Sequence, residues 1–158
     1  STGVPKGVMV PHGGVAGLVS DPGWCVEAGE AVLAHAPHAF DASLFDLWLP
    51  LAVGGRVLVS GPGVVDARRI RAAGAAGVTT LQLTAGLFRV IAEESPECFA
   101  GVRRVMSGGD VVPAGAVARV REACPETVVQ HTYGPTEITL CATLHPVGPG
   151  YRPSEVLP

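Results

Sequence analysis

Short apolar runs and helix-spaced apolar positions alternate along the whole chain. The apolar runs predict strands at residues 8–10, 31–34, 56–59, 78–83, 102–106 and 128–130. Between the runs, apolar side chains recur three or four residues apart, which predicts helices at 12–20, from Asp41 to Gly54, after Asp66, at 87–93 and at 114–123. This alternation favours an α/β fold, with a mostly parallel sheet and flanking helices.

Three polar or glycine-bearing loops follow predicted strands, at residues 39–43, 107–110 and 131–137. Ligands of parallel sheets bind beyond the carboxyl ends of the strands, where such loops converge. We therefore expect these three loops, distant in sequence, to meet around one ligand.

Composition narrows the class of partner. The 158 residues are 47% hydrophobic, enough for one core, and they read as a single domain. A net charge of −3 without a basic cluster favours a small molecule over a nucleic acid or a membrane surface. With no apolar run of about 18 to 20 residues and no signal-type N-terminus, we expect a cytoplasmic protein. The four cysteines form no CxxC pair, which predicts reduced, mostly buried thiols.

Two segments near the N-terminus carry groups suited to ligand binding. Residues 1–7 combine hydroxyls, glycines and Lys6, which can hold a polyphosphate, although they do not fit the Walker pattern and an ordinary turn is the alternative. Residues 40–43, Phe-Asp-Ala-Ser, place Asp41 at a helix start. There it can act as an N-cap, or it can face inward and pair with a substrate ammonium.

The segment Tyr-Gly-Pro-Thr-Glu at residues 133–137 is the third. A β-turn with a helix cap explains its glycine, proline and threonine, but not the whole set. A nucleotide uses the same residue types, because a ring stacks on the base, a hydroxyl contacts phosphate and a carboxylate holds Mg²⁺.

In this order, Ser-Thr-Gly-Val-Pro-Lys-Gly, Phe-Asp-Ala-Ser, Ser-Gly-Gly-Asp and Tyr-Gly-Pro-Thr-Glu resemble the core motifs of the adenylate-forming superfamily. The Phe-Asp-Ala-Ser form is similar to the amino-acid-activating adenylation (AMP-binding) domains of nonribosomal peptide synthetases. The similarity covers essentially all of residues 1–158. It implies part of the large N-terminal subdomain of that fold, as a central fragment truncated at both ends and without the C-terminal subdomain.

The resemblance also implies an activity. ATP and Mg²⁺ would activate an amino acid as aminoacyl-AMP, and the acyl group would pass to the phosphopantetheine thiol of a carrier (thiolation) domain, beside a condensation domain of the parent synthetase. The family's ribose-binding aspartate, hinge and C-terminal lysine have no counterpart here. We therefore expect the isolated chain to bind nucleotide weakly and to lack efficient turnover.

By matching motifs, the resemblance assigns roles to individual residues. Phosphate-loop and nucleotide contacts fall on Thr2, Gly3, Lys6, Gly109, Asp110, Tyr133 and Thr136. Glu137 would bind Mg²⁺, and it would act in catalysis together with Lys6 and Thr136. Asp41 would hold the α-amino group. The wall of the amino-acid pocket would consist of Ala42, Phe45, Gln82, Met106, Gly108, Thr132, Leu140 and Cys141.

None of these wall residues is charged, so we expect a substrate with a neutral side chain. Gly108 is expected to leave depth at the floor, while Gln82 and Thr132 can hydrogen-bond a hydroxyl. A medium or large side chain, aromatic or phenolic, fits best, and an aliphatic one is the alternative. Two other functions stay open: a standalone acyl or aryl acid ligase, which needs no carboxylate at Asp41, and a noncatalytic α/β binding domain.

Overall fold

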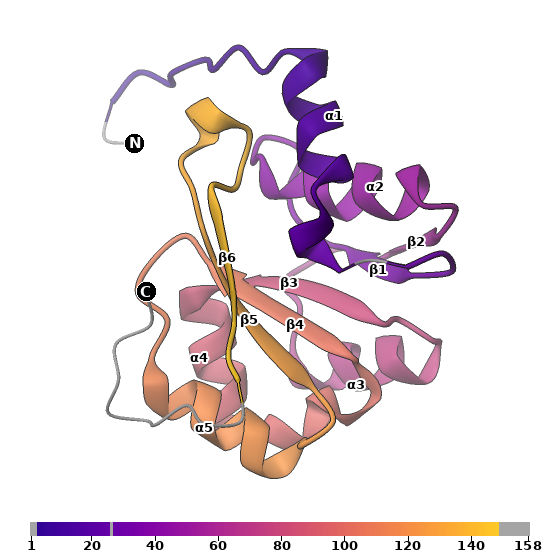
Figure 1. Ribbon diagram of the computed structural model, residues 1–158. Coiled ribbons are helices and arrows are strands. Elements are labelled where there is room, and N and C mark those ends of the chain that lie inside the picture. The colour runs from indigo at the N-terminus through magenta and orange to yellow at the C-terminus, as the bar shows by residue number, and fades with distance from the viewer. Residues whose placement is uncertain (1–2, 26, 149–158) are drawn as a thin grey trace.

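The computed structural model describes residues 3–25 and 27–148, which fold around one six-stranded sheet (Figure 1). In chain order, the elements are α1 (His12–Ser20), η1 (Pro22–Trp24), β1 (Ala31–Ala34), α2 (Ala42–Ala52), β2 (Arg56–Val59), α3 (Ala67–Ala75), β3 (Thr80–Thr84), α4 (Ala85–Glu94), η2 (Pro96–Gly101), β4 (Arg104–Gly108), α5 (Ala114–Ala123), β5 (Val128–Tyr133), η3 (Thr136–Ile138) and β6 (Thr143–Pro146). The strand order is β2-β1-β3-β4-β5-β6. All neighbours pair in parallel except β5 and β6, which confirms the predicted α/β fold with a mostly parallel sheet.

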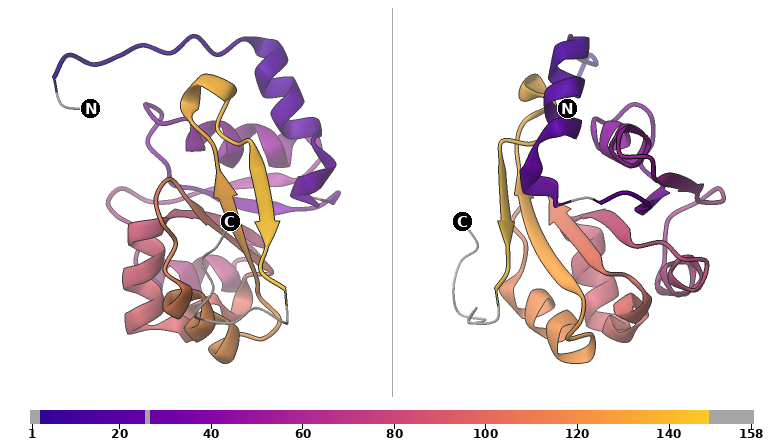
Figure 2. Two further views of the ribbon diagram at one scale, coloured as in Figure 1. Left: turned by 60° about the vertical axis from the view of Figure 1, so that its left-hand side comes forward. Right: turned by 45° about the vertical axis from the view of Figure 1, so that its right-hand side comes forward.

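Helices cover both faces of the sheet (Figures 1 and 2). On one face, α3, α4, α5 and η2 pack over a large core that includes Phe88 and Phe99. On the other face, α1 and α2 enclose a smaller apolar cluster around Trp24, Phe45 and Met106. Strands that are buried on both faces have nearly continuous apolar runs, and these runs allowed the strands to be predicted from the sequence.

Helix ends follow local signals. Asp66 caps α3 by accepting a 2.8 Å hydrogen bond from Arg69 N, as predicted. The chain turns after α2 at Gly54, which has a φ of 72°. At Gly55, an added Cβ would lie 2.3 Å from the carbonyl oxygen of Glu30, so the glycine is required for close packing.

A buried carboxylate ties three strands together at the edge where they begin. Glu30 is 1% exposed and precedes β1. Its Oε1 accepts a 2.6 Å hydrogen bond from Arg103 Nη2, and its Oε2 accepts one of 3.1 Å from Thr80 Oγ1. The hydroxyl of Thr79 also donates to Oε2. Glu30 therefore fixes the starts of β1, β3 and β4 relative to one another.

Some sequence predictions were wrong. Residues 8–10 form no strand, because Met9 is 96% exposed and no described strand pairs with them. Strand β6 was not predicted from the sequence.

Of the cysteines, Cys98 and Cys124 are buried and Cys141 is partly buried, but Cys25 is exposed. Burial raises the pKa of Cys98 to about 12, which keeps that thiol protonated. Within the described ranges, no helix has the length and apolar composition to cross a membrane.

Candidate functional site

A cleft of about 1020 Å³ opens beyond the carboxyl ends of the parallel strands. Each of the three predicted loops contributes to its lining: residues 40–43 from the first loop, Gly108 and Gly109 from the second, and Thr132 and Gly134 from the third. The loop after β2, residues 59–65, closes a further side. The parallel topology brings these loops together, because strands β1 to β5 all end at the same edge.

Asp41 lies immediately before α2, yet its side chain does not cap the helix in the described structure. Its Oδ2 instead accepts a 2.6 Å hydrogen bond from Thr136 Oγ1 of η3. Of the two alternatives for Asp41, the structure therefore does not support the N-cap. The contact joins the loop after β1 to the loop after β5 at the cleft.

The turn that carries Thr136 is tightly constrained. Thr139 and Leu140 have φ values of 66° and 77°, in the left-handed region that non-glycine residues rarely adopt. An added Cβ at Gly134 would lie 2.5 Å from the Leu140 carbonyl oxygen. Ala142 N donates a 2.8 Å hydrogen bond to Tyr133 O, which starts the antiparallel pairing of β5 with β6. The turn therefore holds Thr136 in a fixed position beside Asp41, which lines the cleft.

Several residues predicted for substrate contacts do line the cleft: Asp41, Ala42, Gln82, Gly108, Thr132 and Leu140. Phe45 and Met106 do not, because both are fully buried in the smaller apolar cluster. Cys141 borders a different hollow. The predicted wall is thus divided between the cleft and the packed cluster beneath it.

Gly108 was expected to leave depth in the floor, and the structure corrects this. An added Cβ would lie 2.1 Å from the carbonyl oxygen of Thr132 and 2.4 Å from its Oγ1. The glycine therefore allows β4 and β5 to approach each other, and the space beside it is filled by the neighbouring strand.

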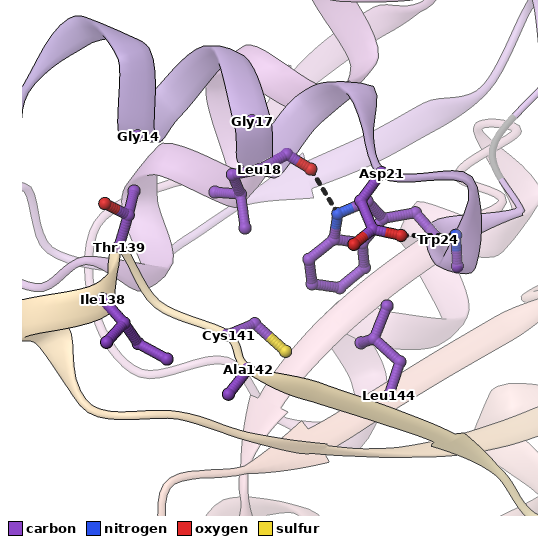
Figure 3. Close-up of a pocket in the computed structure, with 11 residues that line it drawn as sticks. Gly14, Gly17, Leu18, Asp21, Trp24, Ile138, Thr139, Cys141, Ala142 and Leu144 are labelled. Atoms are coloured by element: carbon purple, nitrogen blue, oxygen red, sulfur yellow. Dashed lines mark hydrogen bonds between the residues drawn. The ribbon is translucent and has the colours of Figure 1, made fainter.

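The hollow beside Cys141 has a volume of about 430 Å³ and lies between α1 and residues 138–144 (Figure 3). The indole nitrogen of Trp24 donates a 2.5 Å hydrogen bond to Leu18 O at the base of α1. The Trp24 ring lies 5.1 Å from the ring of Phe45, so it supports this predicted wall residue from behind. Burial raises the pKa of Cys141, whose thiol donates to Thr143 O at 3.1 Å.

Sequence reasoning missed a polar cluster on the cleft wall. Asp46 of α2 is 1% exposed, and its Oδ2 accepts hydrogen bonds from His35 N at 3.1 Å and from Ala36 N at 3.0 Å. His35 Nε2 lies 2.5 Å from the carbonyl oxygen of Gln82. The available signal was a carboxylate on the apolar, inward face of a predicted helix.

The residues predicted for the nucleotide are more widely spread. Gly109 lines the cleft, while Asp110 is exposed and accepts a 2.7 Å hydrogen bond from Val111 N. Tyr133 is 63% exposed, Glu137 is also exposed, and neither is part of the lining.

The N-terminal predictions lie away from these groups. Gly3 and Lys6 are exposed in an extended segment that runs off from the start of α1 (Figure 2), and Thr2 falls outside the described residues. In the part of the chain that the structure covers, no three His, Cys, Asp or Glu side chains cluster to hold a metal.

Comparison with known proteins places the chain among relatives. A family model described as AMP-binding enzyme matches residues 1–156. Malpibaldin synthetase of Mortierella alpina is 40% identical over 147 residues, which cover 90% of this chain but only 3% of that protein.

Two solved structures from Klebsiella oxytoca are similar in fold. The N-terminal subdomain of NpsA, in complex with 3-hydroxyanthranilyl-AMSN, is 29% identical with a TM-score of 0.85, and the match covers 93% of this chain and 38% of that one. NpsA-ThdA, an artificially fused adenylation-PCP di-domain NRPS, is 25% identical with a TM-score of 0.86, over 96% of this chain and 28% of that one. The fold described above therefore matches an N-terminal subdomain of this kind.

Proposed function

The chain belongs to the family of AMP-binding enzymes, and from this membership we propose that it forms part of a domain that activates an amino acid as aminoacyl-AMP in nonribosomal peptide synthesis. The hydrogen bond between Asp41 and Thr136 carries the proposal. In an aminoacyl-AMP, the amino nitrogen is separated from phosphorus only by the α-carbon, the carbonyl carbon and one oxygen. A site for this molecule must therefore hold an ammonium-binding group beside a phosphate-binding group, and the proposal is supported by the carboxylate and the hydroxyl that lie side by side in this pair.

The reaction that we propose is attack of the amino-acid carboxylate on the α-phosphate of ATP, with release of pyrophosphate. Catalysis of such a step consists mainly of positioning and charge neutralisation. Asp41 accepts hydrogen bonds from the substrate ammonium, and a charge-assisted bond of this kind fixes orientation. Thr136 donates a hydrogen bond from its hydroxyl to a phosphate oxygen.

ATP would arrive with Mg²⁺, and the exposed carboxylate of Glu137 is a suitable ligand. Mg²⁺ is usually held by one or two carboxylates together with substrate phosphates and waters, so a cluster of protein ligands is not required. The ion would neutralise phosphate charge. We assign Gly109, Asp110 and Tyr133 to the adenine side, and Thr2, Gly3 and Lys6 to a phosphate-binding loop.

The side chain of the substrate is proposed to be neutral. The cleft is lined by Gln82 and Thr132, which can hydrogen-bond a hydroxyl, and by the apolar Leu140. Asp46 also lines it, and its Oδ2 is occupied by two backbone N–H groups. Transfer of the acyl group to a carrier-domain phosphopantetheine is the proposed second step, and the adenylation-PCP architecture of NpsA-ThdA supports a carrier partner.

An ATP–pyrophosphate exchange screen of the full-length protein that carries this sequence tests the proposal. We expect exchange with one or a few amino acids that have neutral side chains. Highest exchange with Asp, Glu, Lys or Arg would overturn the side-chain assignment. Absence of exchange with every acid tested would favour a noncatalytic binding domain.

An aryl acid is the second candidate substrate, because the NpsA subdomain is in complex with 3-hydroxyanthranilyl-AMSN. An aryl acid has no α-ammonium to pair with Asp41. Exchange with aryl acids that persists in Asp41→Ala would favour this candidate over an amino acid.

A further inference from the structure

The first turn of α2 is not held by a conventional cap. Pairing with Thr136 takes the Asp41 carboxylate away from the helix N-terminus, and no side chain caps α2 in the described structure. A helix start without a cap leaves backbone N–H groups unpaired and frays readily. Some other contact must therefore keep the segment from His35 to Asp41 in place.

Asp46 supplies that contact. Its side chain is buried one turn into α2, and side chains in a helix tilt back toward the N-terminus. Its Oδ2 accepts hydrogen bonds from two consecutive backbone amides, at His35 and Ala36, where the chain leaves β1. One carboxylate oxygen thereby links the start of the loop after β1 to α2, the helix that follows the loop.

The same loop is linked sideways to the neighbouring strand. The His35 ring donates from Nε2 to the carbonyl oxygen of Gln82, 2.5 Å away, and both residues line the cleft. The loop start is thus held between α2 and β3. Phe40 and Asp41, at the other end of the loop, connect directly to α2 through the hydrogen bonds from Ser43 N to Phe40 O and from Leu44 N to Asp41 O.

We propose that Asp46 is a positioning residue, which closes the loop between β1 and α2 and so holds the Asp41 carboxylate toward the ammonium of the substrate. This proposal rests on the proposed function of Asp41. Asp46 acts through the loop backbone and need not touch the substrate itself.

The spare oxygen of Asp46 makes a sharp test possible. Oδ1 is buried and has no hydrogen-bond partner among the described residues. In Asp46→Asn, the amide oxygen can keep both loop contacts while the NH₂ group takes the place of Oδ1, where no bond is lost. Asp46→Ala removes both contacts. Asp66→Ala is the matched control, because Asp66 also accepts a backbone N–H but does not line the cleft.

The experiment measures pyrophosphate exchange by the full-length protein, together with hydrogen exchange of the His35 and Ala36 amides. We expect Asp46→Ala to raise KM for the amino acid about tenfold or more, with a smaller change in KM for ATP, and to speed exchange of both amides. Asp46→Asn should restore KM to within about threefold of wild type. Asp66→Ala should lower the melting temperature and leave KM unchanged.

Each possible outcome supports or overturns the positioning role of Asp46. A lower melting temperature in Asp46→Ala with unchanged KM would make Asp46 merely structural and overturn the proposal, as would equal losses in the Ala and Asn variants. If Asp46→Ala does not fold, Asp46→Ser, whose hydroxyl is too short to reach both amides, replaces it. If wild type activates no acid, the proposed function is wrong, and unchanged amide exchange in the variant would separately overturn the role of Asp46 in the loop.

Discussion

Thr136 Oγ1 donates a 2.6 Å hydrogen bond to Asp41 Oδ2, although the two residues are 95 positions apart in sequence. The bond uses Oδ2 of Asp41, so Oδ1 can accept from a ligand, and ammonium binding and this contact are compatible. The Thr136 hydroxyl has one proton, so it must give up its bond to Asp41 in order to donate to phosphate. The two substrates are therefore expected to influence each other's binding through this pair.

Replacing Thr136 with Val tests that coupling, because the shape is kept and the hydroxyl is lost. We expect kcat/KM to fall about tenfold or more for both the amino acid and ATP, since hydrogen bonds to charged groups contribute about 1.5 to 3 kcal/mol. Thr136→Ser, which keeps the hydroxyl, should stay near wild type. A loss confined to ATP would show that the contact with Asp41 does not influence the amino acid.

Asp41→Ala should cost activity more than stability. Loss of a charge-assisted contact to the ammonium corresponds to about 1.5 to 3 kcal/mol in kcat/KM. Because the Asp41 side chain does not cap α2 and loses only its part-buried bond to Thr136, the loss of stability should be smaller than the loss of activity. Exchange kinetics and a melting curve on the same preparation check this. A large fall in melting temperature with activity intact would refute the assignment.

For Glu137→Gln, we expect a higher Mg²⁺ requirement and an unchanged melting temperature. The amide has nearly the same shape but is a poorer ligand for a hard cation, and the side chain is exposed and outside the core. Exchange rates measured across a range of Mg²⁺ concentrations give the answer. The same Mg²⁺ dependence in variant and wild type would remove Glu137 from the metal site.

Two glycine substitutions should have opposite effects on stability. Gly108→Ala forces a Cβ against the Thr132 backbone, and overpacking of this kind costs about 1 to 3 kcal/mol or more. Gly17→Ala, in the middle of α1 with open space around it, should stabilise by about 0.5 to 1 kcal/mol. Urea denaturation measures both, and a Gly108→Ala variant as stable as wild type would contradict the close approach of β4 and β5.

The pH dependence of stability should report Asp46. Burial raises its pKa from the ordinary value of 3.8, with hydrogen bonds from Ala36 and His35 acting in the opposite direction. A raised pKa means that the folded state holds the proton more tightly, so this contribution is fully present below pH 3.8 and is lost as pH rises through the folded pKa. Asp46→Asn should remove that part of the profile, and identical profiles in both proteins would contradict the shift.

Local patterns gave most of the fold. Helix α5 spans Ala114–Ala123 as predicted behind Pro113, and Asp66 caps α3. Strand β6 was not predicted because its pairing depends on the left-handed turn at Thr139 and Leu140. Neither threonine nor leucine indicates a positive φ in a sequence. Residues 8–10 have strand-like composition but find no partner in the described sheet, so pattern alone was misleading.

The site was predictable only in part, for a physical reason. Loop positions after strands follow from the topology, so the meeting of Asp41 with the loop of Thr136 could be anticipated. Which wall residues reach the cleft depends on packing, and Phe45 and Met106 are covered by neighbours that include Trp24. The role of Asp46 arises from backbone amides at His35 and Ala36, whose positions exist only once the sheet has formed.

The carboxylate of Glu30 anchors the sheet at the edge where the strands start, whereas the cleft lies at the edge where they finish. Alterations in the loops that line the cleft should therefore leave this anchor untouched. We therefore expect that the loops after β1, β4 and β5 can be exchanged for those of a relative while the strand register is kept. In protein engineering, the contacts of Glu30 would be kept constant while the loops at the opposite edge of the sheet are replaced.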